Sequence, residues 1–481
     1  MKVLLINEPF VPDFCRTQRW AARTRGRVIR PPDWLAYATA VLEREGVDAE
    51  LWDFCALGLG KEKLRYLVAD KRPDVVVLDS TTPSIYSDIE CARIVKGAWP
   101  AKVVIVGPHA SALPEETLIA AGGAADIIAI GEYDHTIRDI CLNPDAPEKV
   151  DGLCFLDGQE PKRTPPRALI EDLDSLPFPA WHQLDLMQYF DGLKLHPFID
   201  VIGGRGCPNR CAFCLWPQVM HGTRYRLRSP GNILDEIESD IELCPAVMKS
   251  GEFFFEDDTF TANRERAAAI CEEIMRRRRG MRFSINCRAD LDDPEMFRIL
   301  KAAGCRELLV GFESGDPEIL RRMNKNLTPD QSRNFMSLAK RNKLVVHGCF
   351  VLGMPGETEE SIGRTIDFAL SLGLDSVQFS AAIPFPGTEL YEMCRREGLL
   401  EGKDWDRWLG DGEQRSVFTP SGMTPSAVDS RADAALRRFY FRPGYMLSFL
   451  FKSRNVSDIR RKVRGARNFL RYLRENPGRG R

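Results

Sequence analysis

The feature that most constrains this 481-residue chain is a strand-then-helix alternation that occurs twice. Short β-branched runs alternate with amphipathic stretches over residues 1–145, and the same alternation returns over residues 198–386. Alternation of this kind predicts parallel sheets with helices packed on their faces. The chain is long enough for two such domains and a smaller third one.

The first series predicts an α/β domain of the doubly wound, Rossmann-like type at residues 1–145. Ligands of such a sheet bind at the carboxyl ends of its strands. The expected strands are Val3–Asn7, Ala49–Phe54, Asp74–Asp79, Lys102–Gly107 and Asp126–Gly131. The expected helices are Asp33–Glu45, Glu62–Lys71, Ile85–Lys96 and Glu115–Ala121.

The second series predicts a partial TIM barrel at residues 198–386, with its site at the carboxyl ends of six strands. The expected strands are Ile199–Gly203, Glu252–Glu256, Arg282–Arg288, Glu307–Gly311, Val345–Leu352 and Ser376–Ala382. The expected helices are Ile233–Leu243, Arg264–Arg278, Pro294–Ala303, Pro329–Lys340 and Glu359–Leu372.

Two further segments complete the organisation. Residues 146–197 are expected to be a linker, because repeated prolines interrupt regular structure there. Residues 387–481 are expected to be a helical C-terminal extension, with Trp405 and Trp408 in an irregular stretch. Its amphipathic helices either pack on the barrel flank or contact a membrane surface or a partner.

Composition narrows the function classes. A net charge of −2 argues against general nucleic-acid binding. The start of the chain predicts a strand rather than a signal peptide, and no apolar run approaches membrane-spanning length. The 14 cysteines, which follow no repeating framework, suit a reducing cytoplasm. We therefore expect a cytoplasmic protein without a membrane span.

Three cysteines follow the first strand of the second series. Cys207, Cys211 and Cys214 have the spacing C-x3-C-x2-C. Three thiolates suffice for three irons of a cubane 4Fe–4S cluster, which leaves one iron open for a small molecule. A disulfide is disfavoured in a cytosolic chain. A zinc site would need a fourth ligand, and His221 is the only local candidate.

The spacing, with Phe213 directly before the third cysteine, resembles the signature of the radical SAM superfamily. The resemblance implies that S-adenosylmethionine (SAM) chelates the open iron. It also implies that one electron, supplied by a flavodoxin- or ferredoxin-type donor, cleaves SAM to a 5′-deoxyadenosyl radical.

The resemblance extends to the carboxyl ends of later barrel strands. It implies that Glu256, Asp257 or Asp258 contacts the SAM amine, and that Glu313 contacts SAM from the next strand but one. Arg288 suits the SAM carboxylate as a bidentate partner, although a surface salt bridge to Asp290 is the alternative.

The loops of the first series resemble the cobalamin-binding domain that precedes many radical SAM domains. The similar segments are 107–110, reading GPHA, and 131–134, reading GEYD. The chain has no D-x-H-x-x-G motif to supply a histidine to cobalt, since Asp53 has no histidine two places on. Cobalamin is therefore left uncertain between a base-off corrinoid site and a scaffold that has lost its corrinoid.

The first loop is long and rich in arginine, from Arg16 to Arg30, and also contains Trp20. Charge runs are commonly solvated, which gives one interpretation. The other is a cap over the site of the second domain, because loops on rigid scaffolds often carry binding residues.

The substrate is less constrained. Tyr225 and His347 are candidates for the general acid or base, each with a structural alternative. Acidic groups at the site would suit a cationic aminosugar. In its length, in residues 214–218, which read CLWPQ, and in its arginine-rich first loop, the chain resembles the radical SAM 1,2-diol dehydratases (lyases) of aminoglycoside antibiotic biosynthesis. That similarity implies dehydration of a substrate such as paromamine, with a separate NADPH-dependent reductase as partner and without cobalamin.

Three alternatives remain open at this stage. The first is a cobalamin-dependent radical SAM methyltransferase. The second is a relative that modifies hopanoids or tetrapyrroles. The third is a non-catalytic iron–sulfur carrier.

Overall fold

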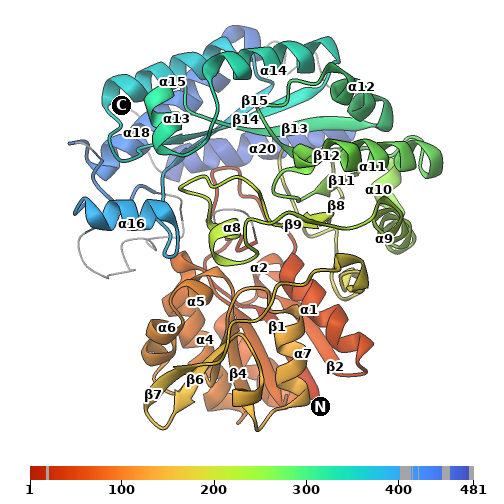
Figure 1. The fold of residues 1–481 in the computed structure, drawn as a ribbon, viewed down its shortest axis with the longest axis vertical. Coiled ribbons are helices and arrows are strands. Elements are labelled where there is room, and N and C mark those ends of the chain that lie inside the picture. Colours follow the sequence, from red (N-terminus) through yellow and green to blue (C-terminus); the bar gives the residue numbers. More distant parts are fainter. Residues whose placement is uncertain (18–20, 401–412, 414, 421, 447–455, 476–481) are drawn as a thin grey trace.

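The computed structural model describes residues 1–17, 21–400, 413, 415–420, 422–446 and 456–475. Two sheets lie one above the other along the long axis of the molecule (Figure 1). One large hydrophobic cluster contains side chains from both, including Trp34 near the first sheet and Trp216 beside the second. The two domains therefore share a packed interface.

The N-terminal sheet has seven strands in the order β2-β1-β3-β4-β5-β6-β7. Its first five strands pair in parallel, and each of them was predicted from the sequence. They are β1 (Lys2–Asn7), β2 (Asp48–Asp53), β3 (Val75–Asp79), β4 (Lys102–Val106) and β5 (Ile127–Ala129). Every residue of β3 is buried, as expected of a strand covered on both faces.

The sheet continues beyond the predicted boundary at residue 145. Strands β6 (Leu153–Asp157) and β7 (Glu160–Arg163) form an antiparallel hairpin on its edge. The proline-based prediction of a linker over 146–197 is thus wrong for these residues. Pro161 occupies the last strand of the sheet, an edge position that tolerates a missing backbone donor.

Helices cover both faces of this sheet, as predicted. The longer ones are α1 (Asp33–Arg44), α3 (Lys61–Lys71), α4 (Ile85–Ala98), α6 (Pro114–Ala121) and α7 (Asp134–Leu142). Two short helices, α2 (Phe54–Leu57) and α5 (Pro108–Ala112), lie at carboxyl ends of strands.

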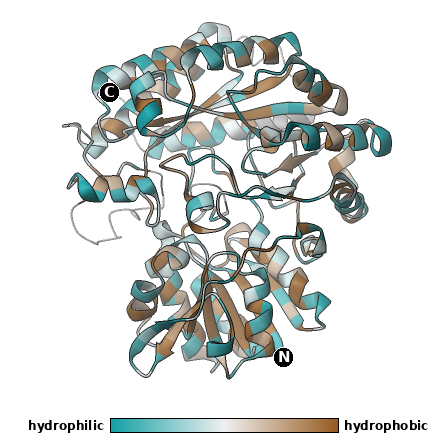
Figure 2. Ribbon diagram, viewed as in Figure 1, coloured by the Kyte–Doolittle hydropathy of each residue, from teal (hydrophilic) through white to brown (hydrophobic). Residues whose placement is uncertain are grey.

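The second sheet is wholly parallel, with the strand order β15-β14-β13-β12-β11-β8. Its six strands confirm the predicted partial barrel. They are β8 (Phe198–Val201), β11 (Glu252–Phe255), β12 (Phe283–Arg288), β13 (Cys305–Glu313), β14 (Val345–Leu352) and β15 (Ser376–Ala381). Figure 2 shows strands of both sheets in brown and many of the surrounding helical residues in teal.

The barrel helices follow their strands as expected. They are α9 (Pro230–Leu243), α10 (Ala246–Lys249), α11 (Arg264–Arg277), α12 (Pro294–Ala303), α13 (Pro317–Arg322), α14 (Pro329–Arg341) and α15 (Glu359–Ser371). Helices α14 and α15 start at capping boxes, in which Thr328 and Thr358 accept from the backbone three residues on.

The described part of the C-terminal extension is helical, as predicted. It contains α16 (Glu389–Arg396), α18 (Pro425–Tyr440) and α20 (Val456–Glu475). Helix α18 packs along β15, and the amide of Asn468 on α20 donates to the Gly26 carbonyl at 3.1 Å. The open flank of the partial barrel is therefore covered by the C-terminal helices and the first loop. Trp405 and Trp408 lie outside the described residues.

Among the described helices, none combines the length and the apolarity that crossing a bilayer requires.

Candidate active site

The cysteine loop starts where β8 ends and leads into the short helix α8 (Leu215–Val219). Strand β9 (Gly204–Arg205) pairs with β10 (Arg226–Leu227) and holds the start of this loop. Gly206 has a φ of 93°, and a Cβ atom there would clash with the Arg224 carbonyl. The glycine-rich start of the loop thus allows a turn that other residues would obstruct.

Cys207, Cys211 and Cys214 all line one cavity of about 1480 Å³. It extends along the barrel strands, from residues at their carboxyl ends, such as Arg288, to residues at their amino ends, such as Val345. Polar groups lie beside the buried sulfurs. The Asn209 amide lies 3.5 Å from Cys207 Sγ, and Arg288 Nη1 lies 3.9 Å from Cys211 Sγ. Burial raises the pKa of the Cys211 thiol, and the positive charges of Lys325 and Arg288 oppose that rise.

The donor set fits a cubane cluster. Within the described residues, no three His, Cys, Asp or Glu side chains converge on a single metal ion. A cubane instead takes each thiolate on a different iron, so three separate thiols around one cavity suit it. His221 does not line the cavity with the three cysteines, and its Nε2 lies 2.8 Å from Asp258 Oδ2.

Three of the predicted SAM-contacting acids line this cavity: Glu256, Asp258 and Glu313. A cationic or imidazole group faces each of them. Arg30 Nη1 donates to Glu256 at 3.2 Å, and Lys325 Nζ donates to Glu313 at 2.7 Å. This pairing removes the mutual repulsion that clustered carboxylates would otherwise have.

Glu313 has a φ of 65°, which is uncommon for a residue other than glycine. The register between β13 and β14 shifts between Gly311 and Glu313, so a bulge ends the strand pairing here. Bulges next to active sites redirect side chains. The consequence is that the Glu313 carboxylate joins the cavity lining beside Gly311.

Arg288 also lines the cavity, at the end of β12. Its guanidinium donates to Asp290 at 2.8 Å and to the Lys325 carbonyl at 2.7 Å. The sequence offers the salt bridge to Asp290 as the alternative to SAM binding. The structure contains this salt bridge, and Arg288 Nη1 still lies 3.9 Å from Cys211 Sγ in the cavity lining, so contact with SAM stays a prediction. Phe213 lines the same mouth of the cavity.

Asp257 and Tyr225 do not line the cavity. The Asp257 carboxylate accepts from the Gly203 amide at 2.6 Å, from the Tyr225 hydroxyl at 2.8 Å and from Arg266 at 3.2 Å. These contacts tie the start of the cysteine loop to the end of β11. The structure thus places Asp257 and Tyr225 behind the cavity lining, where they hold the loop in position, and the SAM contact and acid–base roles that the sequence suggested for them stay predictions.

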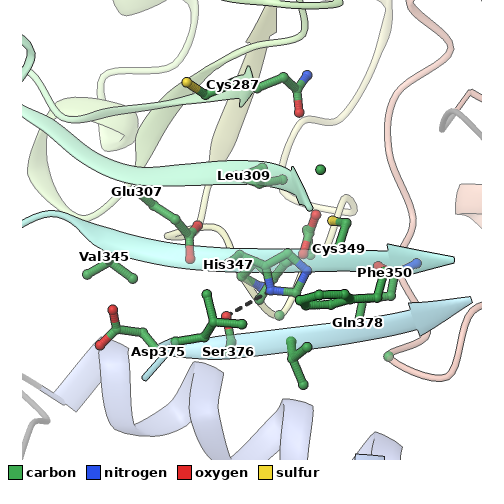
Figure 3. A pocket seen from close by; sticks show the side chains of 18 of the residues that line it. Cys287, Glu307, Leu309, Val345, His347, Cys349, Phe350, Asp375, Ser376 and Gln378 are labelled. Atoms are coloured by element: carbon green, nitrogen blue, oxygen red, sulfur yellow. Dashed lines mark hydrogen bonds between the residues drawn. The ribbon is translucent and has the colours of Figure 1, made fainter. Parts of the chain in front are cut away.

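His347 lines the cavity from β14, the third residue of that strand (Figure 3). It therefore lies deeper in the barrel than the mouth position expected from the sequence. Its Nδ1 lies 2.8 Å from the Ser376 hydroxyl on β15. Burial lowers the pKa of His347 to about 4, so the ring is neutral near pH 7.

The arginine-rich first loop contributes Arg30 to the cavity lining, whereas the sequence indicated only the loop as a whole. Five residues of this loop contribute to the cavity lining, in agreement with the cap interpretation: Thr24, Arg25, Gly26, Val28 and Arg30. Arg30 lies 4.9 Å from the Phe254 ring centroid and donates to Asp191 at 2.9 Å. Arg16 and Arg27 are buried rather than solvated. Trp20 lies outside the described residues.

Lys325 and Asn286 were not identified from the sequence, yet both line the cavity. Asn286 lies in β12 two residues before Arg288, which ends the strand, so reasoning about strand ends could have included it. Lys325 follows α13, away from any strand end, and no local pattern marks it.

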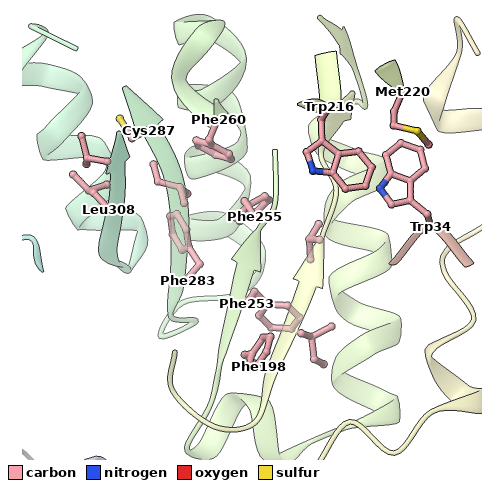
Figure 4. Close-up of a cluster of buried hydrophobic side chains, with 14 of the residues drawn as sticks. Trp34, Phe198, Trp216, Met220, Phe253, Phe255, Phe260, Phe283, Cys287 and Leu308 are labelled. Carbon is pink, nitrogen blue, oxygen red and sulfur yellow. The ribbon is translucent and has the colours of Figure 1, made fainter. Parts of the chain in front are cut away.

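The carboxyl edge of the N-terminal sheet is where a corrin ring would bind, so the residues there test whether the chain fits cobalamin. Trp34 stacks on Trp216 at 5.7 Å with an interplanar angle of 9°, and Met220 lies beside Trp34 (Figure 4). Arg205 lies 4.4 Å from the Trp34 ring centroid and donates to Asp134 at 2.8 Å. Aromatic and charged side chains of both domains thus occupy this interface.

Residues at the neighbouring strand ends are equally enclosed. Arg16 is 2% exposed and donates to Asn7 at 2.9 Å and to Asp88 at 2.8 Å. His109, in the segment that resembles a cobalamin-binding loop, is 1% exposed, and its Nδ1 lies 3.0 Å from the Thr82 hydroxyl. None of these side chains lines the large cavity. The residues present do not fit a corrin ring at this edge.

Comparison with known proteins agrees with the two-domain organisation. Residues 201–369 match the family model of the radical SAM superfamily, and residues 25–140 match the model of the B12 binding domain. The chain therefore contains a radical SAM domain and a B12-binding domain, and the former uses a 4Fe–4S cluster and SAM.

Curated relatives cover most of the chain. An uncharacterized methyltransferase of Pyrococcus horikoshii, PH0819, is 29% identical over 97% of this chain and 98% of its own length. The anaerobic magnesium-protoporphyrin IX monomethyl ester cyclase of Cereibacter sphaeroides is 27% identical over 86% of this chain and 67% of its own length. A cytidylyl-2-hydroxyethylphosphonate methyltransferase of Streptomyces wedmorensis is 24% identical over 78% of this chain and 79% of its own length.

Two solved structures share the fold. The radical SAM methyltransferase TsrM from Kitasatospora setae, solved with tryptophan and a SAM analogue, has a TM-score of 0.69 at 20% identity. The match covers 92% of this chain and 89% of TsrM. The cobalamin-dependent SAM radical enzyme OxsB has a TM-score of 0.70 at 16% identity, with 100% of this chain and 73% of OxsB covered.

Proposed function

We propose that this chain, which joins a radical SAM domain to a B12-binding domain, is an enzyme that cleaves SAM reductively and removes a hydrogen atom from a polar substrate. One observation carries the proposal. A single cavity brings together the three cysteines, the strand-end groups suited to SAM, and a barrel interior lined by polar side chains such as His347 and Gln378.

In this proposal Cys207, Cys211 and Cys214 each bind one iron of the cluster. The cluster and SAM together supply the 5′-deoxyadenosyl radical. Arg288 offers Nη1, which lies 3.9 Å from Cys211 Sγ, to the SAM carboxylate, while its Nε and Nη2 donate to Asp290. The amine suits Glu256 and Asp258, which face the same space.

Glu313 is proposed for the SAM ribose, because a carboxylate accepts hydrogen bonds from hydroxyl groups. Phe213 is proposed to shield the cofactor, because it is apolar, 7% exposed and part of the cavity lining. The cavity exceeds the roughly 300–1,000 Å³ of typical ligand pockets, so SAM and a substrate have room together.

The substrate is proposed to carry hydroxyl groups near the cluster. The acids of the cavity already have cationic or imidazole neighbours, which weakens the expected preference for a polycationic aminosugar. Neutral donors and acceptors, His347 and Gln378, remain suited to hydroxyls. Diol dehydration of an aminosugar such as paromamine stays a sequence-based hypothesis, and none of the relatives described above bears that activity in its name.

Cobalamin-dependent methyl transfer is the second candidate, and the comparisons favour it over dehydration. The match to the B12 binding domain and the methyltransferase names of relatives are the observations that support it. The enclosed Trp34, Trp216 and Arg205 interface is the observation against it, since a corrin there would have to displace them.

The test uses the full chain, reconstituted with iron and sulfide under anaerobic conditions. With SAM and dithionite, release of 5′-deoxyadenosine is expected. A chain that retains its cluster but releases none is a carrier, and the proposal fails. A flavodoxin or ferredoxin with its reductase is the proposed physiological electron donor.

A second measurement separates the two reactions. The protein is incubated with hydroxocobalamin and desalted, and the visible spectrum of bound corrinoid is recorded. No retained corrinoid is expected for the leading proposal. Stoichiometric retention, with S-adenosylhomocysteine as a product, would instead establish methyl transfer.

A further inference from the structure

The cavity that contains the cysteines does not end in the barrel. It continues past β15 to the C-terminal helices, where its lining turns apolar. The apolar residues of this section, which we call the apolar vestibule, are Leu436, Tyr440, Phe441, Tyr445, Met446, Ala466, Phe469 and Leu470. They come from the end of α18, from the residues after it and from α20.

Three vestibule side chains are unusually exposed for their type. Phe441 is 49% exposed, Met446 is 50% exposed and Leu470 is 47% exposed. Large apolar residues that gather at the mouth of a cavity indicate a surface that receives an apolar ligand, because burying them there removes their contact with water.

The vestibule is anchored to the barrel rather than loosely apposed. The Tyr440 hydroxyl donates to the Val377 carbonyl at 2.7 Å and accepts from the Val377 amide at 3.0 Å. The Tyr440 ring lies 5.2 Å from that of Tyr445 and 5.8 Å from that of Phe469. These contacts fix an aromatic wall directly beside β15.

At the barrel end of this wall the lining becomes polar again. Ser376 on β15 lies beside His347, and Gln378 lies two residues further along β15, opposite Cys349 (Figure 3). The Nε2 atom of His347 has no hydrogen-bond partner among the described residues. His347 is only 3% exposed. A buried polar atom without a partner is costly, so this nitrogen is suited to a ligand hydroxyl.

We propose that the substrate is an amphiphile. Its hydroxylated head lies in the barrel near His347, in the same cavity as the cysteines, and its hydrocarbon part lies in the apolar vestibule between α18 and α20. The inference rests on the proposed function for the reaction, but the binding it describes needs neither SAM nor an electron.

An apolar surface such as the vestibule can instead bind a second copy of the chain or another protein. Two observations favour the amphiphile. The apolar surface is continuous with the cavity that reaches the cysteines. Exposed arginines of α20, including Arg467 and Arg471, also flank it, which suits approach to an anionic lipid surface.

The test measures binding of n-alkyl β-D-glucosides, from hexyl to decyl, to the reconstituted enzyme by calorimetry below their micelle concentrations. The dissociation constant is expected to fall about tenfold for every two added methylene groups. The double variant Phe441→Gln/Leu470→Gln should abolish most of this dependence on chain length. His347→Gln should weaken all chain lengths by the same factor.

Val463→Gln is the matched control, because Val463 is 57% exposed on the same helix but does not line the cavity. It should bind like the unaltered enzyme. Affinity that does not change with chain length overturns the proposal. An equal loss in Val463→Gln also overturns it, since that result means adsorption to the surface or an interface with another protein.

The two proposals fail separately. Release of 5′-deoxyadenosine without chain-length-dependent binding leaves the enzyme proposal standing and removes the amphiphile. Chain-length-dependent binding without SAM cleavage does the reverse.

Discussion

Lys325 Nζ lies 2.7 Å from Glu313 Oε1, and both side chains are buried beside the cysteine loop. The lysine therefore neutralises the carboxylate that ends β13. Arg288 donates to the Lys325 carbonyl at 2.7 Å, which connects this ion pair to β12. A residue outside the barrel strands thus helps to set the charge at the site.

Removing Lys325 should destabilise the protein. Lys325→Met leaves the Glu313 carboxylate buried without its partner, a change that costs about 3–5 kcal/mol in comparable pairs. Denaturant unfolding of the protein without its cluster measures the loss. The double variant Glu313→Gln/Lys325→Met should recover most of it, and a single variant as stable as the parent would contradict a tight ion pair.

Each of the three loop cysteines should be required for the cluster. Cys207→Ala, Cys211→Ala and Cys214→Ala are expected to lose the electron paramagnetic resonance signal of the reduced cluster and most of the roughly four irons per chain. Cys349→Ala is the control, because Cys349 lines the same cavity but lies on β14. Loss of iron in that variant would show that the cluster is held elsewhere.

His347 should stay neutral well below pH 6. Burial lowers the pKa of His347 to about 4, whereas histidine in the unfolded chain has a pKa of about 6.5. As pH falls, the unfolded chain therefore binds this proton at a higher pH than the folded protein does. The contribution of His347 to stability therefore falls as pH falls from about 6.5 to about 4. Nuclear magnetic resonance of labelled histidine, assigned with His347→Gln, records the titration, and a midpoint above pH 6 would be inconsistent with the buried ring.

Glu357 should give the opposite dependence. Burial raises its pKa to about 8, although the Gly353 and Met354 amides donate to it at 2.6 and 3.0 Å. The folded state then holds a proton that the unfolded chain has released, so stability falls as pH rises from about 4.5 to about 8. Unfolding free energies of the parent and of Glu357→Gln should diverge across this window by a few kcal/mol, on the order of 1.4 per pKa unit. Parallel curves would mean that Glu357 is ionised.

The sequence predicted most of the architecture, because buried parallel strands and amphipathic helices differ in how apolar residues recur along the chain. Strand β14 runs from Val345 to Leu352, as predicted, because apolar residues stand on both sides of His347 and Gly348 in its sequence. The hairpin β6–β7 was missed, because its short, proline-containing second strand gives no apolar pattern. Edge strands need little apolar character, which hides them from this kind of reasoning.

Site residues could be predicted where a sequence motif lies at the end of a strand. They could not be predicted where segments that are distant in the sequence come together in the fold. Glu256 and Asp258 were found beside Asp257, but only the fold separates the two that line the cavity from the one that holds Gly203. Within a strand, side chains alternate between the two faces of the sheet, so the sequence predicts the face on which each one lies. This rule does not apply to residues 256–258, because they follow the end of β11. Arg30 and Lys325 reach the site from distant segments, so no local spacing marks them.

The wall opposite the strands is assembled from the two extremes of the described chain. Arg27 donates to Glu413 at 3.1 Å and to Glu475 at 2.5 Å, which fastens the first loop to the last helix. A ribosome therefore releases the cysteine loop long before it releases the residues that enclose it. Iron delivered during translation would meet cysteine sulfurs that the C-terminal segments do not yet cover. Those segments would then pack over a cluster that is already bound.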